Sequence, residues 1–153
     1  MVKVIMNGAT GKMGQVITRL VGEMEEVSIV AGVDINDSVV NPYPVYRDIF
    51  EVREPADVII DFSHPSCLEP LLSYACEKEL PVVVATTGLS ENQKEMIRTA
   101  AGKTAAGSLL WELRSRSQPK WRNWQFAAEK NNLWNIPVPA AHLSARQAIL
   151  PEH

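Results

Sequence analysis

The sequence has 153 residues, of which 46% are hydrophobic and 22% are charged, with a formal net charge of −3 at pH 7. This length suits one ordinary domain with a real core, and the charge gives no electrostatic basis for binding a nucleic acid. Since apolar runs are far shorter than a membrane span and no secretory signal core is present, we expect a cytoplasmic protein with no membrane partner.

The chain opens on a glycine-rich turn between a strand and a helix. Residues 2–6 predict the strand, Gly8, Gly11 and Gly14 follow it, and the helix is predicted from Gly11 to about Met24. Its apolar face comprises Met13, Val16, Ile17, Leu20 and Val21. This arrangement is typical of a site for a dinucleotide pyrophosphate, although other strand-to-helix turns also use glycine. In the dinucleotide interpretation, Gly8 leaves the strand, Gly11 admits the phosphates and Gly14 allows close packing.

A second predicted strand, 27–33, ends in Asp34. An acid at this place accepts hydrogen bonds from the adenosine ribose in dinucleotide-binding domains; the alternative is an ordinary strand-end acid. The next residue is Ile35 rather than an arginine, which favours NADH over NADPH because a 2′-phosphate would face the carboxylate unpaired. The positive charge of Lys12 would partly neutralise a 2′-phosphate, so the expected preference for NADH over NADPH is moderate.

The alternation of strands and helices continues to about residue 103. In order, we predict a loop over 36–44, an ambiguous segment over 45–52, a strand over 57–62, a helix from Ser63 or His64 to about Lys78, a strand over 81–85, a loop over 86–88 and a helix over 91–101 with a capping box at Ser90 and Gln93. This pattern predicts an α/β fold with a Rossmann-like, doubly wound parallel sheet. Ligands of such sheets bind at the carboxyl ends of the strands.

Two further strand ends carry candidate contacts. Residues 61–63 form either a wall beneath the nicotinamide half of the cofactor or a strand-end acid beside a core phenylalanine. Thr86 and Thr87 either hydrogen-bond the nicotinamide ribose or carboxamide, or belong to a plain loop before a helix. We expect His64 to begin a helix rather than act in acid–base catalysis, because no partner for it is evident.

The two cysteines, Cys67 and Cys76, fall within a predicted helix. We expect buried free thiols there, packed with Leu68, Leu71, Leu72 and Ala75. The spacing of cysteines, histidines and acids does not match a metal site, so we predict no metal.

Three segments together resemble the dihydrodipicolinate reductase family, also called 4-hydroxy-tetrahydrodipicolinate reductases. They are Gly-Ala-Thr-Gly-Lys-Met-Gly at 8–14, Asp-Phe-Ser-His-Pro at 61–65 and Val-Ala-Thr-Thr-Gly-Leu-Ser at 84–90. Their order and spacing match the family over residues 1–103, and the combination is much more specific than the glycine turn alone.

The resemblance implies an NAD(P)H-dependent reductase of bacterial lysine and diaminopimelate biosynthesis, which delivers a hydride to a cyclic imine-type dicarboxylate. Members of the family are typically homotetramers assembled through a second domain. With Phe62 added from its place at a strand end, the implied cofactor-binding residues are Gly8, Ala9, Thr10, Gly11, Lys12, Met13, Asp34, Phe62, Ala85, Thr86 and Thr87. No catalytic residue is assigned.

From residue 104 the chain departs from the family. Residues 104–110 stand where the family has an Asn-Met-Ser or Asn-Phe-Ser segment, and the family's His-His pair, lysine and Asp-x-Pro-Ser-Gly-Thr segment are not found. All four tryptophans lie in this part. We therefore predict a dinucleotide-binding domain over 1–103 and an atypical tail over 104–153, a foreign, truncated or out-of-frame replacement, and little turnover from this chain alone.

Three alternatives stay open at this point. The first is an NAD-binding module without catalytic activity. The second is another Rossmann enzyme such as a semialdehyde dehydrogenase, which needs a cysteine in a strand-end loop, whereas Cys67 and Cys76 fall in a predicted helix. The third is a chain whose tail prevents stable folding.

Overall fold

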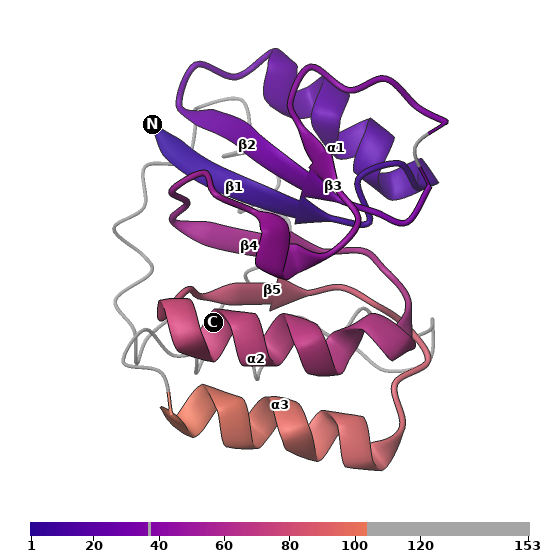
Figure 1. Ribbon diagram of the computed structural model, residues 1–153, viewed down its shortest axis with the longest axis vertical. Coiled ribbons are helices and arrows are strands. Elements are labelled where there is room, and N and C mark those ends of the chain that lie inside the picture. The colour runs from indigo at the N-terminus through magenta and orange to yellow at the C-terminus, as the bar shows by residue number, and fades with distance from the viewer. Residues whose placement is uncertain (37, 104–153) are drawn as a thin grey trace, which may run out of the picture. The chain divides into compact units, whose positions relative to one another are not determined.

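The computed structural model describes residues 1–36 and 38–103, which form a five-stranded parallel sheet with helices on both faces (Figure 1). The elements are β1 (Val2–Asn7), α1 (Lys12–Gly22), β2 (Val27–Val33), β3 (Val45–Tyr46), η1 (Ile49–Glu51), β4 (Val58–Asp61), η2 (Pro65–Cys67), α2 (Leu68–Lys78), β5 (Val82–Val84) and α3 (Glu91–Lys103), where η marks a single 3-10 turn. The predicted tail lies outside the described residues. Within those residues, no helix is long and apolar enough to cross a membrane.

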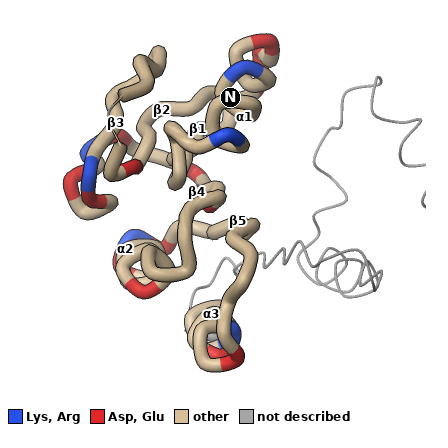
Figure 2. Tube along the Cα trace, turned by 90° about the vertical axis from the view of Figure 1, so that its right-hand side faces the viewer, with Lys and Arg blue, Asp and Glu red and all other residues tan. Residues whose placement is uncertain are grey.

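The strand order is β3-β2-β1-β4-β5, and every neighbouring pair is parallel. The chain thus builds outward from β1 on one side and then continues through β4 on the other, which confirms the predicted doubly wound sheet. Because crossovers between parallel strands are right-handed, helices leaving in opposite directions cover opposite faces. Figure 2 shows α1 on one face and α2 on the other, with α3 beyond β5. The loops after β1 and β4 therefore meet where the strand order reverses, the usual ligand position in such sheets.

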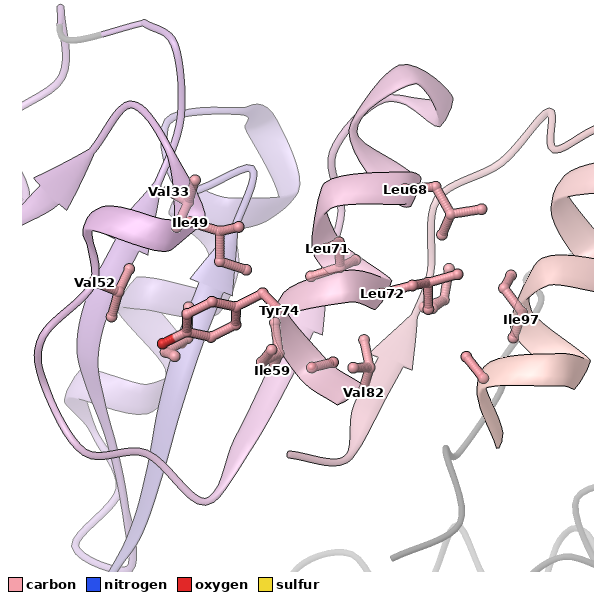
Figure 3. Packing of buried hydrophobic residues seen from close by; sticks show 14 of the residues in the cluster. Val33, Ile49, Val52, Ile59, Leu68, Leu71, Leu72, Tyr74, Val82 and Ile97 are labelled. Atoms are coloured by element: carbon pink, nitrogen blue, oxygen red, sulfur yellow. The ribbon is translucent and has the colours of Figure 1, made fainter. Parts of the chain in front are cut away.

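The main hydrophobic core lies between the sheet and α2 (Figure 3). Tyr74 of α2 points toward Val52, and Leu72 of the same helix faces Ile97 of α3. The predicted buried positions Leu68, Leu71, Leu72 and Ala75 are all buried. This packing of α2 fixes the position of the β4 end, which carries part of the candidate site.

The apolar face of α1 is largely exposed in the described part of the chain. Met13, Val16 and Leu20 are exposed, and Ile17 and Val21 are only half-buried. The buried position of α1 is Gly14, where an added Cβ would lie 2.2 Å from the Gly8 carbonyl oxygen. The helix therefore packs through its backbone at the glycine turn.

A hydroxyl pair supports α1 further along. Thr18 Oγ1 lies 2.5 Å from the Tyr43 hydroxyl, which belongs to the segment before β3. Burial raises the pKa of Tyr43, and the hydrogen bond with Thr18 acts in the opposite direction.

Short-range signals explain the remaining helix starts. Ser90 N donates to Gln93 Oε1 and Gln93 N donates to Ser90 Oγ, which confirms the predicted capping box of α3. His64 caps η2, since its Nδ1 accepts from Ser66 N at 3.2 Å. The ambiguous segment over 45–52 contains β3 and η1, and Asp48 caps η1 by accepting from Phe50 N.

Candidate functional site

A cleft of about 640 Å³ lies at the carboxyl ends of β1, β2, β3 and β4. The glycine turn after β1 contributes Gly8 and Gly11, and the ends of β2 and β3 contribute Asp34 and Arg47. The segment from Phe62 into the first turn of α2 contributes a further part of the lining. The cleft is large enough for a small organic ligand.

The glycine turn is held tightly against the end of β4. Gly8 has φ +84°, and a Cβ added there would lie 2.6 Å from the Phe62 carbonyl oxygen. A residue with a side chain would be strained at this φ and would also collide with β4. Gly8 N and Ala9 N both donate to the Val33 carbonyl oxygen, so the turn is also tied to β2.

Gly11 differs from Gly8 and Gly14 because an added Cβ would make only an ordinary contact with the described chain. An added Cβ at Gly11 would meet only the Gly8 carbonyl oxygen, at 3.4 Å, so the described chain leaves room for a methyl group. Gly11 is the N-cap of α1 and supplies no side-chain acceptor to the first N–H groups of the helix. Those donors and the positive end of the helix dipole favour an anion beside Gly11.

Asp34 stands across the cleft from the end of β4, and its carboxylate is held by two backbone donors. Oδ2 accepts from Thr10 N at 3.0 Å, and Oδ1 accepts from Asn36 N at 3.1 Å. Asp34 N donates to the Tyr46 carbonyl oxygen, which joins β2 to β3. Each carboxylate oxygen keeps further acceptor capacity, so the group can accept from ligand hydroxyls.

A buried carboxylate, Asp61, joins three strand ends beneath the cleft. Asp61 is 1% exposed and accepts from Asn7 Nδ2 at 2.9 Å and from Thr86 Oγ1 at 2.7 Å. Ser63 donates to the same carboxylate through its N at 3.2 Å and its Oγ at 2.5 Å. Of the two interpretations of Asp61, the structure therefore supports the strand-end acid.

The structure places the predicted cofactor residues in three groups. Gly8, Gly11, Asp34 and Phe62 line the cleft. Ala9 and Thr10 are buried within the turn, while Lys12 and Met13 are exposed at the start of α1. Ala85, Thr86 and Thr87 do not line the cleft as the described residues form it.

Two interpretations of the strand ends change as a result. Thr86 is buried and donates its hydroxyl hydrogen to Asp61, so it has no hydroxyl donor left for a ligand. Thr87 is exposed. Phe62 is half-buried and lines the cleft, so the core-phenylalanine alternative is wrong.

Among the lining residues that sequence reasoning did not assign to the site are Arg47 and Cys67. Arg47 follows β3, a two-residue strand too short to give a periodic signal, and it reaches the cleft because β3 pairs with β2. Cys67 was expected to be buried, but it is a half-buried free thiol that lines the cleft. It stands at the junction of η2 and α2, where the chain passes beside the β4 end.

Comparison with known proteins gives a consistent relationship. The family model for the N-terminus of dihydrodipicolinate reductase matches residues 2–109. A 4-hydroxy-tetrahydrodipicolinate reductase from Caldanaerobacter subterraneus subsp. tengcongensis is 44% identical over 101 residues, which cover 66% of this chain and 40% of that protein. The counterpart from Clostridium novyi is 45% identical over 97 residues, covering 63% of this chain and 38% of that protein.

Solved structures agree on the fold. Dipicolinate-bound dihydrodipicolinate reductase from Paenisporosarcina sp. TG-14 matches with a TM-score of 0.55 and 22% identity, covering 66% of this chain and 44% of that one. The myo-inositol 2-dehydrogenase from Lactobacillus plantarum matches with a TM-score of 0.58 and 15% identity, covering 96% and 48%. The chain spans about 40% of the length of the first curated relative it matches. It belongs to the dihydrodipicolinate reductase family, and its described residues form the N-terminal dinucleotide-binding domain of that family.

Proposed function

We propose that this chain binds NADH or NADPH in the cleft, with NADH preferred, as the cofactor-binding part of a 4-hydroxy-tetrahydrodipicolinate reductase. The geometry at Gly11 carries the proposal. Gly11 leaves space where a side chain would stand, beside helix N–H groups that have no side-chain cap. This combination suits a pyrophosphate, and Asp34 at the neighbouring strand end suits the adenosine ribose.

In this proposal each group of residues binds a different part of the dinucleotide. Gly8 to Met13 hold the pyrophosphate, Asp34 accepts from ribose hydroxyls, and Phe62 contacts the nicotinamide half. Ala85 and Thr87 contact the nicotinamide nucleotide through backbone groups or by movement of their loop, while Thr86 supports that loop through Asp61. A bound reduced nicotinamide supplies the hydride that such a reductase transfers.

The residues beyond the family match bear on the role of the described domain. The family model matches residues 2–109, and the first curated relative is more than twice as long as the part matched. We propose a dinucleotide-binding domain over 1–103 and a tail over 104–153 that does not match the family's substrate domain. In this proposal the dinucleotide-binding domain serves lysine biosynthesis in the cytoplasm together with a substrate domain of the family type, on which family-type homo-oligomers also depend. The alternative is a dinucleotide-binding module without catalytic activity.

The test measures binding and turnover separately with the purified full chain. Nucleotide fluorescence reports NADH binding, and loss of nicotinamide absorbance on addition of 4-hydroxy-tetrahydrodipicolinate reports turnover. We expect binding with little or no turnover. Substrate-dependent oxidation of NADH would show that the chain contains a working substrate site, and failure to bind either nucleotide would contradict the proposal as a whole.

A further inference from the structure

The pairing of β2 with β3 brings a second charged residue to the place proposed for the adenosine ribose. Val33 and Tyr46 are partners in the parallel register, and Asp34 N donates to the Tyr46 carbonyl oxygen at 2.9 Å. The residues that follow these partners, Asp34 and Arg47, therefore leave adjacent strands at the same edge of the sheet. Both line the cleft.

This juxtaposition bears on the difference between NADH and NADPH. The adenosine ribose of NADH has two free hydroxyls, and the Asp34 carboxylate can accept from both without help from a cation. A 2′-phosphate at the same place would be repelled by Asp34 unless a cation stood beside it. The residue after Asp34 along the chain is Ile35, which carries no charge, so the cation has to come from another segment.

We propose that Arg47 is a specificity-determining residue, which contacts the 2′-phosphate of NADPH and narrows the preference for NADH that Asp34 creates. The inference rests on the proposed dinucleotide site and concerns its adenosine end. A guanidinium binds phosphate through two parallel N–H donors, which suits this role better than an ammonium group. Arg47 also makes an interaction within the chain, and a guanidinium carries five N–H donors in all.

The surroundings of Arg47 agree with this role. Arg47 is exposed at the rim of the cleft, where a phosphate can reach it. The adjacent Asp48 is a lining acid as well, but its Oδ1 accepts from Phe50 N as the cap of η1. Figure 2 shows basic and acidic residues next to each other beyond β3. Lys12, the cation considered from the sequence, is at the start of α1 and does not line the cleft as the described residues form it.

The experiment titrates NADH and NADPH separately into the full chain and follows nucleotide fluorescence. Arg47→Gln keeps a polar side chain of similar length without the charge. We expect it to weaken NADPH binding by about tenfold or more, since a charge-assisted contact is lost, and to change NADH binding by less than about twofold. Raising the salt concentration should weaken NADPH more than NADH in the wild-type chain, and this difference should shrink in Arg47→Gln.

Two control variants locate the effect. Lys12→Gln is expected to weaken both nucleotides equally, because Lys12 stands beside the pyrophosphate place. Arg53→Gln changes an exposed arginine outside the cleft and should alter neither. An NADPH-to-NADH affinity ratio that is unchanged in Arg47→Gln, or that falls instead in Lys12→Gln, would overturn the inference. A wild-type chain that binds NADH but not NADPH would also overturn the inference. A wild-type chain that binds neither nucleotide would instead refute the proposed function.

Discussion

Asp61 has the largest structural role of any single polar side chain in the described part of the site. Its carboxylate accepts from Asn7 of β1, from Ser63 after β4 and from Thr86 after β5. Each donor is at least partly removed from water, so the carboxylate compensates for the solvation that these groups lose. Asp61 therefore joins three strand ends through its side chain, in addition to the backbone hydrogen bonds of the sheet.

Replacing Asp61 tests that role. Asp61→Ala leaves the donors of Asn7, Ser63 and Thr86 without their acceptor, and we expect the free energy of unfolding to fall by at least about 3 kcal/mol. Asp61→Asn keeps an acceptor for Asn7 and Ser63, while the Thr86 hydroxyl can rotate to accept from the new amide, so the loss should be clearly smaller. Urea denaturation measures both, and equal losses in the two variants would contradict the assignment.

At the scale of elements, the cap at the start of α3 also holds that helix to the segment beside the cleft. Ser90 and Gln93 exchange backbone-to-side-chain hydrogen bonds, and Gln93 Nε2 also donates to the Pro65 carbonyl oxygen at 2.8 Å. Gln93 therefore connects the start of α3 to η2, which leads into α2.

Substitutions in this cap should reveal the connection. We expect Ser90→Ala to cost about 1 kcal/mol of unfolding free energy and Gln93→Ala to cost more, because it also loses the bond to Pro65. The double variant should lose less than the sum, since the two cap bonds depend on each other. Asn92→Ala, an exposed position in the same turn, is the control. Strictly additive losses, measured by denaturation, would show that the box is not a coupled unit.

Local signals account for what could be predicted at this scale. The parallel sheet follows from apolar runs that alternate with helical periodicity, and the cap of α3 follows from Ser90 and Gln93. The strand β3 could not be predicted, because two residues carry no period and the strand is defined by its pairing with β2, which a loop separates from it. The helix α1 and its apolar face follow from periodicity, but the exposure of that face does not, because Gly14, which periodicity ignores, determines how the helix packs.

The site shows the same division between local and non-local information. Gly8, Gly11 and Asp34 line the cleft as expected, because the turn and the strand end are local features. Arg47 reaches the cleft only through strand pairing. The role of Thr86 depends on Asp61, 25 residues earlier in the chain, so residue type alone could not separate a ligand contact from an internal hydrogen bond.

At the scale of the whole molecule, the fold is compatible with more functions than the residues of the site are. The same sheet matches a dihydrodipicolinate reductase and a myo-inositol 2-dehydrogenase with similar TM-scores, so it supports several reactions. The family assignment comes from sequence similarity over residues 2–109. What the described domain contributes in our account is the dinucleotide site.

The central claim is that a dinucleotide occupies the space beside Gly11, and a matched pair of variants tests it most directly. Gly11→Ala and Gly22→Ala each add one methyl group to α1 or its cap, and the described chain has room for both. Titration of the full chain with NADH should show Gly22→Ala binding like the wild type. Gly11→Ala should bind about tenfold more weakly or worse while the chain stays folded, because the methyl group stands in the place of the pyrophosphate. Wild-type affinity for NADH in Gly11→Ala would contradict the account.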